Sequence, residues 1–225
     1  MRFLTQQDSE PVHSRFVALD KLVIEHDHRL QVFCKTKSVK SGQLLAGTDR
    51  DPPGIPDRTG DDNALGIAAE VTGKAHSGYD YWALAKNGDF YSLGSLFEDE
   101  RYQNSIFFNT RIVQITEALL YCKKLYSRLG FPLNSSVRMR ITHGGLQGRV
   151  LTASGTRAFS MLFKDSTREN QVSTEIEFLL ANVEADLIDL VKRLAEPLFL
   201  IFNFGHFEHQ IYEQIITDFV AGKVT

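Results

Sequence analysis

The sequence predicts an α+β fold in which an antiparallel sheet packs against a long central helix and the C-terminal helices. Apolar residues recur at helical spacing through residues 104–130. Alternating, strand-like segments lie on both sides of this stretch, at 79–99, 136–154 and 171–180. Helical spacing returns between residues 183 and 220.

Composition sets the bounds. The chain has 225 residues, 43% of them hydrophobic, and a formal net charge of −3. A chain of this length can bury a core without disulfides or metal, and its charge gives no electrostatic argument for nucleic acid or an anionic membrane. Without an apolar N-terminal run or a membrane-length apolar segment, we expect a soluble, cytoplasmic protein with no membrane association. No cofactor-binding motif is found, so no cofactor is predicted.

The N-terminal part predicts two strands, residues 14–25 and 29–34, although 16–24 also fits a helix. Lys35, Lys37 and Lys40 follow, and such alternating charge is typical of a solvated edge strand. Residues 47–63 are rich in Pro, Gly and Asp and predict a long loop or a seam. We therefore divide the chain into an N-terminal piece, 1–63, and a main α+β domain, 64–225.

A short apolar run at 64–73 predicts a strand or one helical turn. Residues 79–99 predict a β-hairpin, since Asn87 and Gly88 form the dipeptide favoured in tight turns. Lys86 and Asp89 face each other across this turn, and Trp82 is expected to pack against the central helix.

The central helix is the best-specified element. Its apolar positions recur at steps of three and four: Phe108, Ile112, Ile115, Leu119, Cys122, Tyr126 and Leu129. Gly130 suits the left-handed position after the last turn, and Pro132 prevents continuation. Cys122 lies on this stripe and is expected to be buried; nothing in the sequence supports a disulfide with Cys34.

After the helix, Val137, Met139 and Ile141 alternate with polar residues and predict a strand. Residues 149–152 are expected to return as its partner, and 171–180 predicts a further strand. A helix then spans 183–194, and Pro197 is expected to break or kink it. The nearly all-apolar segment 198–204 is expected to be deeply buried.

The last helix has two apolar rows. One row is Phe207, Ile211, Ile215 and Phe219, and the second is Tyr212, Ile216 and Val220. Docking on its own domain needs one row, so the second favours a homodimer through the C-terminal helix; burial of both rows within one chain is the alternative.

His143 precedes two glycines at the end of a strand, a place that can present an imidazole to a ligand. No Ser or Cys in a nucleophile context accompanies it, which favours a bystander in a loop. His206 and His209 stand three apart near the last helix and could share a metal ion, but a bare two-His spacing is weak evidence and no metal site is predicted.

Arg138, Arg140 and Arg149 could form a basic stripe that contacts nucleic-acid phosphates. Glu175 and Glu177 occupy the matching positions of another strand, however. If the two strands are neighbours, Arg and Glu form cross-strand pairs that satisfy the charges within the sheet. The structural interpretation is favoured over the nucleic-acid interface.

Three segments carry a resemblance to a known family: FFNTRIVQITEALLYCKKLYSRLGFP, RITHGGLQGRVLTAS and LVKRLAEPLFLIFNF. From about residue 79 onward the chain resembles the region that follows the N-terminal domain in prokaryotic Schlafen AlbA-type proteins, which are described as ATP-binding or helix-turn-helix proteins. The resemblance implies an accessory or sensing role beside a nucleic-acid-linked partner. It assigns no residue a role.

Three functions follow as hypotheses. The first is a non-enzymatic accessory, sensory or protein-interaction domain of a nucleic-acid-linked system, with a protein partner. The second is a hydrolase or nuclease that uses His143 or the pair His206 and His209. The third is nucleic-acid binding through Arg138, Arg140 and Arg149.

Overall fold

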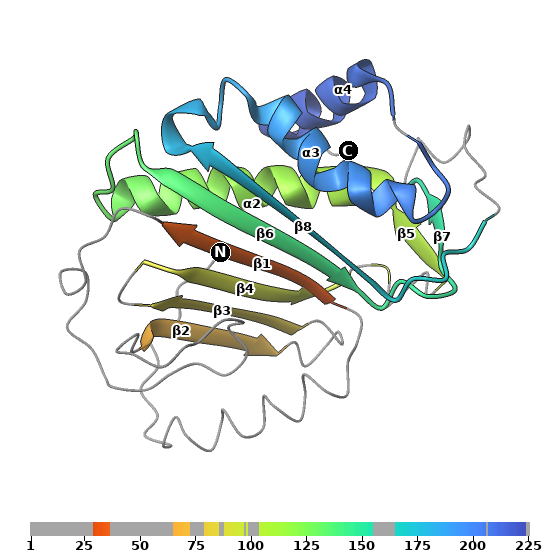
Figure 1. Cartoon of the computed structure of the whole chain (residues 1–225), viewed down its shortest axis with the longest axis horizontal. Coiled ribbons are helices and arrows are strands. Elements are labelled where there is room, and N and C mark those ends of the chain that lie inside the picture. The colour runs from red at the N-terminus through yellow and green to blue at the C-terminus, as the bar shows by residue number, and fades with distance from the viewer. Residues whose placement is uncertain are drawn as a thin grey trace.

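The computed structural model describes residues 29–36, 65–72, 79–85, 88–96, 98, 104–154, 165–205 and 207–223. Within them lie a six-stranded sheet, a two-stranded sheet and three α-helices (Figure 1). The predicted strand at 14–25, the whole Pro-rich segment 47–63 and Lys86 lie outside these residues. The α+β class predicted from the sequence is confirmed.

The six-stranded sheet is antiparallel throughout, in the order β2-β3-β4-β1-β6-β8. Its strands are β1 (Arg29–Thr36), β2 (Leu65–Thr72), β3 (Tyr79–Ala85), β4 (Phe90–Ser95), β6 (Ser136–Gly144) and β8 (Gln171–Leu179). The hairpin predicted around Gly88 is present as β3 and β4, and Gly88 has a positive φ of 87°. Trp82 is half-buried and packs against the core, and its predicted contact with the central helix stays a prediction.

Strand β1 lies inside the sheet, where it pairs with β4 on one side and β6 on the other. The edge interpretation of Lys35 is therefore wrong, because Lys35 pairs with Arg138 of β6. Lys37 and Lys40 lie outside the described residues. Since β1 joins strands from beyond residue 64, the sheet includes residues from both sides of the boundary at residue 63, which itself is not described.

Helix α2 (Phe108–Arg128) crosses one face of the sheet (Figure 1) and buries Ile112, Ile115 and Leu119. It begins four residues later than the periodicity predicts, because Ser105–Phe107 forms the short strand β5. It ends as predicted, with Gly130 at a φ of 80°. Apolar spacing cannot distinguish a strand that leads into a helix from the first turn of that helix.

Strand β7 (Val150–Thr152) pairs in parallel with β5 and forms the second sheet. The expectation that residues 149–152 return beside the strand at 136–144 is therefore wrong. The neighbours of the strand at 136–144, β6, are β1 and β8. The two glycines between β6 and β7, Gly145 and Gly148, allow the chain to leave the main sheet and have φ values of 68° and 78°.

Helix α3 (Leu187–Leu200) follows a short 3-10 turn and packs against β8 and α2. It runs through Pro197, so the predicted break at this residue is wrong. Burial of Leu194, Leu198 and Phe199 outweighs the hydrogen bond that proline cannot donate. Segment 198–204 is buried only in part, since Leu200 is 55% exposed.

Helix α4 (His209–Val220) packs on α2 and α3. Phe207, just before it, stacks on Phe108 of α2 at a centroid distance of 4.3 Å. Tyr212 and Ile216, two of the three residues of the second apolar row, are buried within the chain, while Val220 is 59% exposed. The chain itself therefore covers two of the three residues of this row, which removes most of the argument for a second copy, while the homodimer itself stays a prediction.

Among the described residues, no helix is both long enough and apolar enough to cross a membrane.

Candidate functional site

Two of the three arginines predicted as a basic stripe, Arg138 and Arg140, lie on the face of β6 that points away from α2. Arg138 pairs in register with Glu177, and Arg140 with Glu175, because β6 and β8 are neighbours. Arg140 donates from Nε to Glu175 Oε2 at 2.9 Å, and its Nη2 forms an ion pair with the same oxygen at 2.8 Å. The predicted cross-strand pairing is confirmed.

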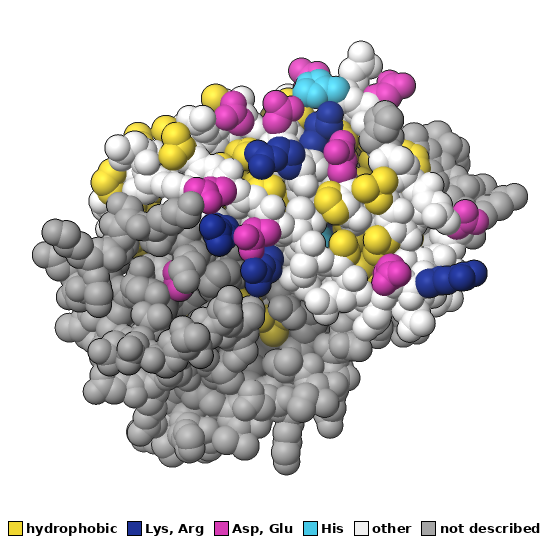
Figure 2. Space-filling model, viewed as in Figure 1, with side chains coloured by type: hydrophobic (Ala, Val, Ile, Leu, Met, Phe, Trp, Pro, Cys, Tyr) yellow, Lys and Arg dark blue, Asp and Glu magenta, His cyan; other side chains and the backbone are white. Residues whose placement is uncertain are grey.

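Arg138 completes this ladder of charges. Its guanidinium lies 3.6 Å from Glu175 and 3.7 Å from Glu177. Figure 2 shows basic and acidic side chains interspersed on the side of the molecule that carries β6 and β8. Because each arginine faces a carboxylate, this part of the surface presents little positive potential to a phosphate backbone.

Arg149 does not belong to this face. It is 4% exposed and donates from Nη1 to the backbone carbonyl of Ser105 in β5, at 3.4 Å. The structure thus separates Arg149 from Arg138 and Arg140, which are exposed on the main sheet. Sequence reasoning grouped the three because it placed β7 beside β6.

His143 is the last inward-facing residue of β6. It is 2% exposed, and its Nε2 has no hydrogen-bond partner among the described residues. Burial, together with the positive charge of Arg111, lowers the pKa of His143 from 6.5 to about 3. The imidazole is therefore neutral near pH 7.

Arg111 belongs to a buried ion pair that the sequence reasoning missed. Its Nη2 donates to Glu98 Oε2 at 2.7 Å, and both side chains are 0% exposed. Glu98 Oε1 accepts the backbone N–H of Phe107 at 2.8 Å. The signal was present in part: Arg111 sits on the apolar stripe of α2, three residues after Phe108 and four before Ile115.

Glu98, Arg111 and His143 form what we call the buried polar cluster, at the N-terminal end of α2. Beside it, Asn109 holds Ser154 by two reciprocal bonds: Nδ2 donates to Ser154 Oγ at 2.8 Å, and Ser154 N–H donates to Oδ1 at 3.0 Å. These contacts fix the start of α2 to β5 and to the end of β7. No side chain caps the start of α2 in the usual way. The Glu98 carboxylate instead accepts the N–H of Phe107, the residue just before the helix, so the cluster has a structural role there.

The chemistry open to this cluster is limited by burial. A neutral imidazole can accept or donate one proton, but substrate would have to reach a side chain that is 2% exposed. No Ser or Cys hydroxyl or thiol donates to Nε2 of His143 among the described residues. The cluster therefore lacks the nucleophile–base contact of a hydrolase within the described part of the chain.

The two-His metal site is left without structural support. His209 is exposed at the first turn of α4, and His206 lies outside the described residues. Across the described ranges, no three His, Cys, Asp or Glu side chains lie close enough together to hold a metal ion.

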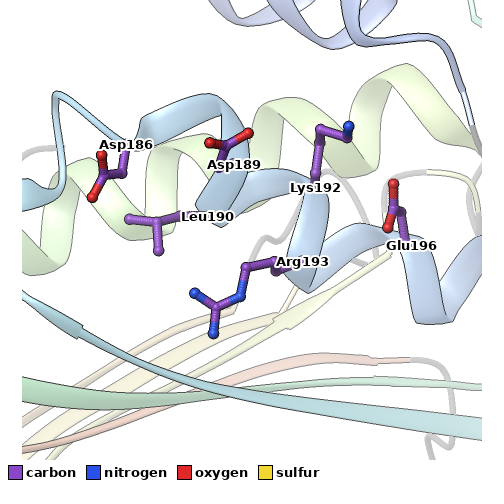
Figure 3. A pocket seen from close by; sticks show the side chains of 6 residues that line it. All are labelled: Asp186, Asp189, Leu190, Lys192, Arg193 and Glu196. Atoms are coloured by element: carbon purple, nitrogen blue, oxygen red, sulfur yellow. The ribbon is translucent and has the colours of Figure 1, made fainter.

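A hollow of about 450 Å³ lies along α3, lined by Asp186, Asp189, Leu190, Lys192, Arg193 and Glu196. In Figure 3, Lys192 and Arg193 point to opposite sides of the helix. The lining charges are of both signs, come from one helix and its N-terminal end, and do not converge, which is typical of a solvated helix face.

Comparisons with protein-family models, with curated proteins and with solved structures find no match to this chain.

Proposed function

We propose that this chain is a non-enzymatic accessory or sensory module that binds a protein partner within a nucleic-acid-linked system. One observation supports this most: the side chains that were candidates for catalysis or nucleic-acid binding are buried or paired with other residues of the fold. His143 is buried beside Arg111, Arg149 is buried against β5, and Arg138 and Arg140 face glutamates. The nucleic-acid-linked setting rests on the resemblance to the Schlafen AlbA-type proteins alone.

The surface we assign to the partner lies where β8 ends. Leu133 and Leu179 are 54% and 42% exposed, and their segments are joined by a bond of 2.8 Å from Ala181 N–H to the Leu133 carbonyl. Two exposed leucines on neighbouring segments can form an apolar patch that a protein partner would cover, whereas single ones need no explanation.

The test uses tagged full-length chain cross-linked in cells. Wild type should retain a partner at fixed stoichiometry, and Leu133→Asp with Leu179→Asp should remove it without changing the melting temperature by more than a few degrees. Leu200→Asp, at a leucine that is 55% exposed elsewhere, is the matched control and should retain the partner. Equal loss in the control, or no stoichiometric partner, contradicts the proposal.

The other hypotheses have direct tests. Stoichiometric zinc or manganese in purified protein would favour the hydrolase or nuclease, and a gel shift at low salt would favour nucleic-acid binding. The homodimer through α4 stays a separate proposal. It now depends on Val220 and the half-buried Ile211 and Phe219, and light scattering at micromolar concentration tests it.

A further inference from the structure

The chain has two cysteines, and the fold brings them together. Cys34 lies on β1 in the middle of the sheet, and Cys122 lies on α2. Both are free thiols and 1% exposed. The side chains of Cys34 and Cys122 lie close enough to interact, and this interaction raises the pKa of the Cys34 thiol.

A second contact fixes this arrangement independently. Tyr126, one turn after Cys122 on α2, donates its hydroxyl to the backbone carbonyl of Cys34 at 3.3 Å and to that of Gly88 at 2.8 Å. Tyr126 is 0% exposed, so the bonds are shielded from water. The helix is thus held against β1 within one turn of the thiol pair.

We propose that Cys34 and Cys122 form a reversible disulfide that ties β1 to α2 when the protein meets a peroxide. This modification site goes beyond the proposed partner binding and does not depend on it. Its consequence is a covalent link between the sheet and the helix that covers it.

The chemistry balances with hydrogen peroxide as the oxidant. The thiolate of one cysteine attacks a peroxide oxygen; an S–O bond forms, the O–O bond breaks, and hydroxide leaves and is protonated to water. The second thiolate then attacks the resulting sulfenic sulfur; the S–S bond forms, the S–O bond breaks, and a second water leaves. The two thiols lose two electrons, and the peroxide gains them.

The surroundings set the rate. The interaction with Cys122, burial and the nearby Asp89 raise the pKa of the Cys34 thiol well above its usual value. Since the thiolate is the reactive form, oxidation should be slow near neutral pH and faster as the pH rises. We therefore expect the disulfide to form slowly and, once formed, to stabilise the folded chain.

The experiment treats folded full-length protein with hydrogen peroxide and no denaturant. We expect loss of both thiols, a mass lower by two hydrogen atoms, and a non-reduced peptide that joins the Cys34 and Cys122 segments. The melting temperature should rise by about ten degrees, because the link closes a long loop of the unfolded chain, and dithiothreitol should reverse both changes.

Cys34→Ala and Cys122→Ala are the controls, since each leaves one thiol and should show neither the mass loss nor the rise in melting temperature. The peptide map needs no variant, so it decides the matter even if a variant fails to fold. Retention of both thiols, separate over-oxidation of the two cysteines, a link between chains, or a disulfide that forms only in denaturant would overturn the proposal.

Discussion

The buried polar cluster and the ladder of Arg138, Arg140, Glu175 and Glu177 on β6 and β8 each contain an Arg–Glu ion pair. The first pair is buried and the second is exposed to solvent. Arg111 and Glu98 are 0% exposed at 2.7 Å, whereas Arg140 and Glu175 meet at 2.8 Å with exposures of 40% and 36%. Nearly equal distances hide unequal energetics. Water screens the charges of the exposed pair. The two buried side chains have lost their hydration, so each charge is stabilised mainly by the other.

The largest expected effect comes from breaking the buried pair. Arg111→Met leaves the Glu98 carboxylate without its guanidinium, so the free energy of unfolding should fall by about 3–5 kcal/mol. Urea unfolding measures the loss. Adding Glu98→Gln removes the stranded charge yet keeps an acceptor for the Phe107 N–H, so the double variant should recover part of it.

The recovery also serves as the control. If the double variant is less stable than Arg111→Met, the two side chains do not act as a pair. A loss below about 1 kcal/mol in Arg111→Met would place the buried pair in the same class as the exposed ladder and remove the contrast between the two regions.

A second effect separates the regions by pH. The pKa of His143 is about 3 in the folded chain and near 6.5 when unfolded, so the unfolded state alone binds a proton between these values. Stability due to the neutral imidazole is fully present above pH 6.5 and is lost as the pH falls, by about 1.4 kcal/mol per pH unit.

Urea unfolding between about pH 6.5 and 5, above most carboxyl titrations, measures this slope. His143→Gln should lose it, even if that variant is less stable throughout. His209→Gln, which replaces an exposed histidine, is the matched control and should keep the slope of the wild type. Equal slopes in wild type and His143→Gln would contradict the buried, neutral assignment.

The two regions also differ in what the sequence could predict. Alternation along residues 136–142 and 172–178 predicted both strands and, if they are neighbours, that arginines meet glutamates across them; the register that pairs each arginine with its glutamate comes from the structure. Glu98 gave no comparable signal. It lies 13 positions from Arg111, and their contact depends on a turn of the chain that no periodicity encodes.

The same limit explains the other errors. Parallel pairing of β7 with β5 joins segments 45 positions apart, which local patterns cannot reveal. Pro197 stays inside α3 because burial of the surrounding apolar face outweighs local propensity. The contact between Cys34 and Cys122 likewise required the sheet order, since β1 had been placed outside the main domain.

The smallest effect is expected on the exposed ladder. Glu175 accepts from Arg140 and lies 3.6 Å from Arg138, so Glu175→Gln removes the charge that both arginines share. The free energy of unfolding should fall by less than about 1 kcal/mol, and this difference should disappear near 1 M salt, where exposed charges are screened within about 3 Å. Arg111→Met should keep its full loss at the same salt concentration. Glu175→Gln with Glu177→Gln should also leave Arg138 and Arg140 facing solvent without acidic partners on β8, and a gel shift at low salt should then strengthen relative to wild type. For the stability test of Glu175→Gln, a loss of several kcal/mol that does not depend on salt would show that the ladder is shielded from solvent, and the contrast with the buried polar cluster would fail.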